Sequence, residues 1–174
     1  MAHALSLGTR GLGRTWPNPA VGCVIVQGTR IVGRGWTQPG GRPHAEVMAL
    51  RQAGKAARGA TAYVTLEPCA HHGQTGPCAD ALIAAGIARV VTAIADPDPR
   101  VAGKGHALLR AAGIDVTENI LSSEARSVNS GFLKRVTQGL PCVTLKLATT
   151  LDGRIATSTG VSRWITSPGG RWRA

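Results

Sequence analysis

The chain has 174 residues, of which 43% are apolar and 17% charged, and its formal net charge is +11. This length suits one domain with a sizeable core plus a short appendage, and the apolar fraction excludes disorder of the whole chain. No stretch approaches the roughly 18 apolar residues of a membrane span, and the N-terminus lacks a secretory pattern. We therefore expect a cytoplasmic protein with no membrane partner.

The positive charge comes from 20 lysines and arginines against nine acidic residues. Such a surplus favours a phosphorylated substrate or a nucleic acid, because guanidinium groups bind phosphate in a bidentate manner. Nucleic acid is the less favoured of the two, because no Lys/Arg run is long and aromatic residues for base stacking are few. Four cysteines in a chain of this kind favour metal ligands or buried thiols over disulfides. Cys23 and Cys142, in apolar runs, are expected to be buried thiols.

Hydrophobic periodicity and turn residues predict alternating helices and strands. In chain order, the expected elements are a helix over 1–12, a hairpin of strands over 21–27 and 30–36, a helix over 44–57, a strand over 61–66, a helix over 77–85, a strand over 89–94, a helix over 105–112, a strand over 114–118 and a helix over 122–137. Strand–helix–strand alternation requires crossover connections, so the sheet should be largely parallel and led by the antiparallel hairpin. The predicted fold class is a three-layer α/β/α sandwich with a mixed sheet.

A domain boundary is expected at residues 139–141, where a new strand-like run over 142–148 begins. The predicted division is one domain over 1–140 and an appendage over 141–174. The appendage is too short for a second α/β domain, which needs about 100 residues or more. A strand without a partner would leave edge groups and apolar side chains available for association.

Four residues form the most informative pattern in the chain. His44 and Glu46 stand at the start of an expected helix, Cys69 follows the next strand, and Cys78 begins the next helix. Zinc deaminases bind their metal with one His and two Cys, and a Glu two residues beyond the His shuttles protons without binding the metal. Three protein ligands also leave one tetrahedral position open, as in catalytic zinc sites. We therefore expect Zn²⁺ at His44, Cys69 and Cys78, with Glu46 as the catalytic residue.

The alternative interpretation is a structural zinc site or a set of unrelated core residues, with Glu67 merely closing the end of a strand. The joint occurrence of the four residues in this order favours the deaminase pattern. One feature departs from the general motif, in which two residues separate the cysteines. Here eight residues separate Cys69 from Cys78.

Four segments carry a more specific resemblance, and they are TWPNPAVG at 15–22, PHAE at 43–46, EPCAHHG at 67–73 with PC at 77–78, and DPDPRVAGKG at 96–105. With these segments the chain resembles the pyrimidine deaminases of riboflavin biosynthesis, which carry an insertion between their cysteines. The resemblance implies a cytidine-deaminase-like fold. It also implies hydrolysis of 2,5-diamino-6-(5-phospho-D-ribosylamino)pyrimidin-4(3H)-one to 5-amino-6-(5-phospho-D-ribosylamino)uracil and ammonia.

The same resemblance implies a set of substrate-binding residues. Asn18 and His71 match positions that hydrogen-bond the pyrimidine, and Asp96 lies in the loop on the ribose phosphate side. Gln74 stands where Lys or Arg is common and Asp98 where Asn is common, so both weaken the attraction for phosphate. A third departure is Thr37, which stands where His is common.

Two nearby cations, Arg100 and Lys104, are candidate phosphate partners in that loop. The resemblance thus implies a small phosphorylated pyrimidine as substrate. It also implies a homo-oligomer whose copy number the sequence leaves open.

The C-terminal segments LKLATTLDGRIA at 145–156 and SRWIT at 162–166 resemble the beginning of the reductase domain to which these deaminases are fused. That domain uses NADPH. Because only its first piece is present, we expect a truncated reductase segment, no NADPH cofactor and deaminase activity alone.

Two other functions remain open at this point. The first is another zinc nucleobase deaminase, for which the net charge of +11 makes tRNA adenosine the substrate to consider. The second is a non-catalytic remnant that keeps the fold and the zinc.

Overall fold

The computed structural model describes residues 1–71, 76–98 and 102–162, so Gln74 and Arg100 lie outside the described residues. The chain divides into two compact units, Met1–Pro141 and Cys142–Ala174. All α-helices and β-strands of the described residues belong to the first unit. They are α1 (Ala2–Gly8), β1 (Gly22–Gln27), β2 (Arg30–Trp36), α2 (Ala45–Ala53), β3 (Thr61–Val64), α3 (Cys78–Ala84), β4 (Arg89–Thr92), α4 (Lys104–Ala111), β5 (Asp115–Thr117), α5 (Ser122–Val128) and α6 (Ser130–Gln138).

The described strands form one five-stranded sheet in the order β2-β1-β3-β4-β5. Strand β1 is antiparallel to both of its neighbours, whereas β3, β4 and β5 run parallel. The mixed sheet and its leading hairpin are therefore confirmed, but the expectation of a largely parallel sheet is wrong on one side. The reason is that the crossover through α2 returns the chain beside β1 rather than beside β2, so β3 meets a strand of opposite direction.

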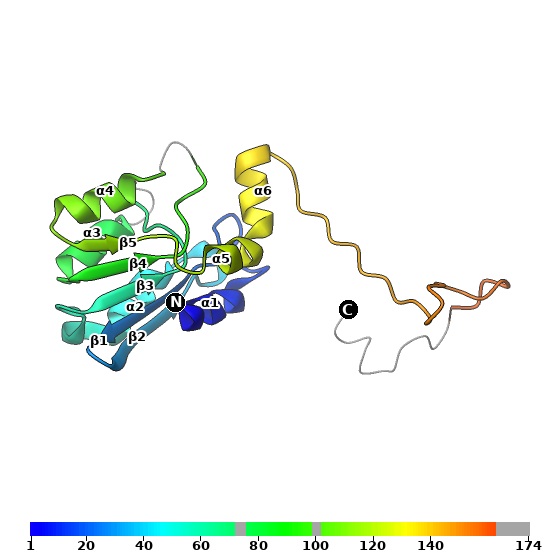
Figure 1. The fold of residues 1–174 in the computed structure, drawn as a ribbon, viewed down its shortest axis with the longest axis horizontal. Helices are drawn as coiled ribbons and strands as arrows, with labels where there is room; N and C mark the ends of the chain where they lie inside the picture. Colours follow the sequence, from blue (N-terminus) through cyan, green and yellow to red (C-terminus); the bar gives the residue numbers. More distant parts are fainter. Residues whose placement is uncertain (72–75, 99–101, 163–174) are drawn as a thin grey trace. The chain divides into compact units, whose positions relative to one another are not determined.

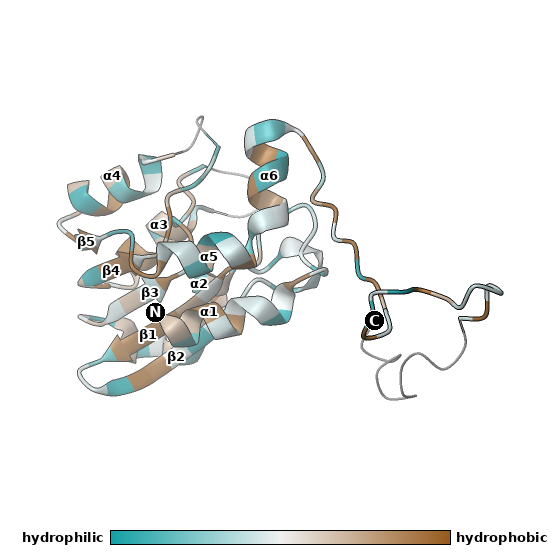
Figure 2. Ribbon diagram, turned by 45° about the vertical axis from the view of Figure 1, so that its right-hand side comes forward, coloured by the Kyte–Doolittle hydropathy of each residue, from teal (hydrophilic) through white to brown (hydrophobic). Residues whose placement is uncertain are grey.

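Helices cover both faces of this sheet, which confirms the three-layer architecture (Figure 1). Cys23 and Ile25 of β1 face a core that includes the inner sides of α2, α3 and α4. Val24, between them, faces the opposite side and packs with Ala4 and Leu7 of α1. This alternation is the two-residue period of a strand that is covered on both faces. In Figure 2 strand β1 is correspondingly hydrophobic along most of its length.

Close packing brings the start of α2 to the sheet. Gly35 of β2 lies so near the Ala45 carbonyl that a Cβ at this position would overlap it. Only glycine allows the backbone of the helix to approach the strand this closely. The contact fixes the first turn of α2, which carries Glu46 and follows directly after His44.

The helix expected over 122–137 is interrupted, and α5 and α6 are separate helices that meet at Asn129. The buried Asn129 side chain accepts a hydrogen bond from the Ala20 N–H at 3.0 Å and donates to the Ala20 carbonyl at 3.1 Å. These bonds to a segment 109 residues earlier explain the break, because the chain must bend to bring the amide to Ala20.

The strand expected over 142–148 is not formed, and Cys142 is exposed rather than buried. Val143, Leu145 and Leu147 expose 82%, 78% and 61% of their surface. A strand requires a hydrogen-bonded neighbour, and the described residues offer none to this segment. Among the described residues, no helix has the length and apolar composition needed to cross a membrane.

Candidate active site

Three side chains from separate parts of the sequence converge at one end of the sheet. His44 is the residue before α2, Cys69 follows β3, and Cys78 is the first residue of α3. His44 Nδ1 lies 3.3 Å from Cys78 Sγ and 3.8 Å from Cys69 Sγ. All three potential ligand atoms lie within 4.8 Å of one another. The residues predicted to bind metal are therefore brought together.

The chemistry of these donors fits zinc. One imidazole nitrogen and two sulfurs are ligands that Zn²⁺ prefers, and three protein ligands leave a position open for reaction. The Cys69 sulfur also accepts a hydrogen bond from the Cys78 backbone N–H at 3.3 Å, at the N-terminus of α3. Such an N–H group stabilises negative charge on the sulfur.

Hydrogen bonding within the cluster favours a thiolate. The Cys78 side chain, and after it His44, lowers the pKa of Cys69 to about 4, whereas the contact with Cys69 raises the pKa of Cys78. The hydrogen bond with Cys69 also raises the pKa of His44. A thiolate at neutral pH is the form of cysteine that binds a metal.

Glu46 lies in the first turn of α2, and only 4% of its surface is exposed. Burial raises the pKa of Glu46 to about 7, and the nearby charge of Cys69 adds to the shift. A carboxyl group with a pKa close to neutrality can both accept and return a proton under physiological conditions. The Glu46 carboxyl also lines the same cavity as His44 and Cys69.

Asn18 is held rigidly next to the cluster. Its backbone N–H donates to the Thr15 carbonyl at 2.8 Å, and the Thr15 hydroxyl donates to its carbonyl at 2.9 Å. Its side-chain Nδ2 donates to the Gly41 carbonyl at 2.8 Å and lies 3.4 Å from His44 Nε2. Asn18 is thus a turn residue whose amide is at the same time aimed at the predicted metal ligand.

A cavity of roughly 870 Å³ connects these groups. Its walls include four of the predicted substrate-binding residues, namely Asn18, His71, Asp96 and Asp98, together with His44, Glu46 and Cys69. The fifth predicted residue, Gln74, lies outside the described residues. Lys104, the other candidate phosphate partner, is exposed at the start of α4 and does not line this cavity. Thr37 also lines it, but its hydroxyl accepts a hydrogen bond from the Val21 N–H.

Glu67 is the residue whose role the sequence interpretation missed. Its buried carboxylate accepts hydrogen bonds from the backbone N–H groups of Asp96, Gly103, Gly105 and His106, at 3.0, 2.9, 2.8 and 3.3 Å. It thereby ties the segment that carries Asp96 to the strand end that carries Cys69. Nothing near Glu67 in the sequence signals these partners, because they lie 29 to 39 residues later.

A hydrogen bond within the segment of Asp96 also holds its conformation. The Asp98 N–H donates to Asp96 Oδ1 at 2.9 Å. Burial raises the pKa of Asp96, with the charge of Glu67 adding to the shift. The acids therefore gather on one wall of the cavity.

Residues of α6 also line the cavity, and the sequence pattern did not single them out. They are Phe132, Arg135 and Val136, and Arg42 lines it from the loop before α2. This helix lies far along the chain from the predicted metal ligands. Its sequence therefore carries no local signal that one of its faces lines the cavity.

Comparison with protein families gives two matches. Residues 1–94 match the cytidine and deoxycytidylate deaminase zinc-binding region, and residues 141–174 match the RibD C-terminal domain. The first match covers His44, Glu46, Cys69 and Cys78.

Individual relatives agree with these matches. The riboflavin biosynthesis protein RibD of Escherichia coli is 60% identical over 98% of this chain. A RibD structure from Acinetobacter baumannii is 54% identical over 98% of this chain and 48% of its own, with a TM-score of 0.88. The diaminohydroxyphosphoribosylaminopyrimidine deaminase/5-amino-6-(5-phosphoribosylamino)uracil reductase structure from Thermotoga maritima is 46% identical over 99% of this chain and 50% of its own, with a TM-score of 0.92. The chain spans about half the length of the curated relatives that it matches, 47% in the case of the E. coli protein.

Proposed function

Because this chain belongs to the family of cytidine and deoxycytidylate deaminase zinc-binding regions, we propose that it hydrolyses an exocyclic amine of a pyrimidine and releases ammonia. The proposed substrate is 2,5-diamino-6-(5-phospho-D-ribosylamino)pyrimidin-4(3H)-one, and the product is 5-amino-6-(5-phospho-D-ribosylamino)uracil. The similarity to riboflavin biosynthesis proteins supports this choice. The observation that carries the proposal is the buried Glu46 carboxyl beside three convergent zinc-type donors, two of which line the same cavity as Glu46.

His44, Cys69 and Cys78 would hold the zinc ion, with Nδ1 as the histidine nitrogen that faces both sulfurs. When bound, zinc supplies acidification of water, whose pKa it lowers toward about 7. The Glu46 carboxylate accepts a proton from the attacking water and delivers it to the ring nitrogen as the C–O bond forms. It then accepts the proton of the new C–OH group and delivers it to the amine, which leaves as ammonia while the C=O bond forms. Its pKa of about 7 suits both directions of transfer.

Two further residues orient the ring in this proposal. Asn18, fixed by its bonds to Thr15 and Gly41, presents its amide toward the substrate, and His71 offers its imidazole from the wall of the same cavity. This assignment is supported by the presence of both residues in the cavity wall. Fixed partners matter because hydrogen bonds that are already oriented need no reorganisation during the reaction.

The first test measures ammonia release by the zinc-loaded, full chain. The protein is offered the diaminopyrimidinone ribose phosphate, cytidine and a tRNA anticodon stem-loop in separate reactions. We expect turnover of the first substrate alone. Preferred turnover of the stem-loop or of cytidine would replace the proposal with another zinc deaminase, and no turnover of any substrate with zinc present would favour a non-catalytic role.

The matched variant is Glu46→Gln, which keeps the size of the side chain and removes the proton-accepting carboxylate. We expect turnover to fall by roughly 10²- to 10⁴-fold, the usual contribution of a general acid–base. Zinc content should be unchanged, because the glutamate is not a ligand. Normal turnover by this variant would contradict the assignment of Glu46.

We also propose that the protein acts in the cytoplasm. All four cysteines are free thiols, which is typical of a reducing compartment. Fractionation of cells that produce the tagged chain tests this, and recovery outside the cytoplasmic fraction would refute it.

A further inference from the structure

One cavity residue that neither the family pattern nor the proposed chemistry uses is Arg135. It lies on α6, at the far end of the first unit's sequence, and lines the same cavity as Glu46 and His44. Its side chain is half-buried, so the guanidinium is accessible to a molecule in the cavity. The question is what a fixed cation at this position would recognise.

Three contacts hold the guanidinium in place. Its Nη2 donates to the Pro17 carbonyl at 2.7 Å. The group also lies over the Trp16 ring, 4.8 Å from the centroid, and 5.5 Å from the centroid of Phe132. Stacking on aromatic faces and one hydrogen bond leave most of its N–H groups available. Within the described residues, Arg135 forms no ion pair with a carboxylate.

Charges of both signs line the cavity. Asp96 and Asp98 are joined to each other and to Glu67 on one wall. Arg135 is anchored to Pro17, which precedes Asn18, and the Asn18 side chain is bonded to Gly41, the neighbour of Arg42. A phosphate dianion beside Asp96 and Asp98 would be repelled, whereas Arg135 would attract it.

We propose that Arg135 binds the phosphate of the substrate and so selects a phosphorylated pyrimidine over the corresponding free nucleoside. This inference rests on the proposed function for the identity of the pyrimidine. It assigns the phosphate to a residue of α6 rather than to the loop at 96–105. A planar guanidinium that is already oriented suits bidentate recognition of a phosphate.

The test compares the phosphorylated substrate with its dephosphorylated counterpart for wild type and Arg135→Ala in the full chain. We expect kcat/KM for the phosphorylated substrate to fall by roughly 10- to 100-fold, mainly through KM, which corresponds to the loss of a charge-assisted hydrogen-bonding group. For the dephosphorylated substrate, kcat/KM should change by no more than about twofold. Arg135→Lys keeps the positive charge but lacks the planar guanidinium that binds phosphate in a bidentate manner. It should therefore recover part of the lost kcat/KM.

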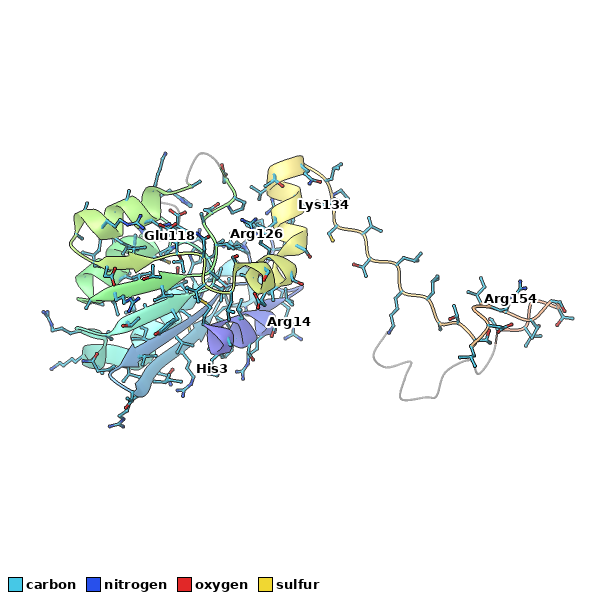
Figure 3. The ribbon with its side chains drawn as sticks, in the orientation of Figure 1. His3, Arg14, Glu118, Arg126, Lys134 and Arg154 are labelled. Atoms are coloured by element: carbon cyan, nitrogen blue, oxygen red, sulfur yellow. The ribbon has the colours of Figure 1, made fainter. Side chains whose placement is uncertain are left out.

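Two controls guard against effects of general charge or folding. Lys134→Ala and Arg126→Ala remove neighbouring cations that do not line the cavity, and both residues are labelled in Figure 3. Each should leave both substrates unaffected. Thermal unfolding and zinc content of Arg135→Ala should match those of wild type. Equal losses for both substrates, or no loss for either, would overturn the phosphate assignment.

A binding measurement separates this inference from the proposed function. Ribose 5-phosphate is titrated calorimetrically into wild type and Arg135→Ala. Arginine-dependent binding together with an absence of pyrimidine turnover would refute the proposed function and leave the phosphate site standing. Turnover of the diaminopyrimidinone, with phosphate binding that does not depend on Arg135, would refute the phosphate site and leave the proposed function standing.

Discussion

The carboxylate of Glu67 joins parts of the chain that the sequence keeps far apart. Its four backbone partners lie on the segment from Asp96 to His106, and Gly105 packs so closely against the Pro68 carbonyl that a side chain there would overlap it. His106, the last of these partners, lies 3.1 Å from Glu118 and 3.0 Å from the Thr92 hydroxyl. A single acid thus holds one wall of the cavity to the end of β3.

We predict that Glu67→Ala destabilises the fold by about 3 kcal/mol, because buried N–H groups lose their acceptor. Glu67→Gln should cost less, since one oxygen remains. Chemical unfolding measures both variants. As a control, Asp80→Asn alters an exposed carboxylate of α3 and should stay within about 0.5 kcal/mol of wild type. A Glu67→Ala variant as stable as wild type would show that water replaces the carboxylate at no cost.

Substrate affinity gives a second readout for the same residue. Because the hydrogen bonds of the Glu67 carboxylate go to the segment of Asp96 and not to the predicted zinc ligands, we expect its substitution to raise KM more than it lowers zinc content. Metal analysis and steady-state kinetics on the same preparations distinguish the two effects.

At the scale of elements, the junctions decide where the site residues lie. The amide of Asn129 is 3% exposed and pairs both backbone groups of Ala20, just before β1. We predict that Asn129→Ala lowers the free energy of unfolding by about 2 kcal/mol, because the buried Ala20 N–H is left without an acceptor. Ser127→Ala, an exposed change on α5, is the control for helix propensity. Equal stability of the two variants, measured by urea unfolding, would contradict a structural role for the Asn129 amide.

The contact between β2 and α2 gives a second prediction at this scale. Gly35→Ala places a methyl group against the Ala45 carbonyl and should push the helix away from the sheet. We expect a loss of about 2 kcal/mol in stability, in the range of overpacking, and weaker zinc binding because His44 precedes this helix. Gly76→Ala is the matched control, since nothing lies within 4 Å of its added Cβ. Thermal unfolding and a competitive zinc titration would reveal whether the two changes differ as expected.

At the scale of the whole molecule, the described part of the second unit exposes apolar side chains. Val143, Leu145 and Leu147 are 61–82% exposed, whereas comparable residues of the first unit form its core. Exposed apolar segments favour association between chains. Replacing all three with Ser should reduce self-association in sedimentation velocity as concentration rises. The control replaces Thr144 and Thr149 with Ser, and equal behaviour of the two variants would refute association through this segment.

Much of the site could be predicted before the structure, because local patterns carry it. The order of His44, Glu46, Cys69 and Cys78 at the starts of helices and the end of a strand is a local property, and so are the hairpin and the periodic helices. Where the prediction failed, a distant partner overrode the local signal. Asn129 ends a helix because of Ala20, and residues 142–148 form no strand because the described residues offer no neighbouring strand.

By itself, the sequence determined which residues have the chemistry of a zinc deaminase and the class of fold that carries them. Only the tertiary structure decided that β3 lies beside β1, that Glu67 holds the segment of Asp96, and that Arg135 of α6 faces the cavity. The physical reason is that side-chain type and hydrophobic period are local properties. Hydrogen bonds across 29 to 39 residues and the lining of a cavity depend on how the elements pack, which no local pattern encodes.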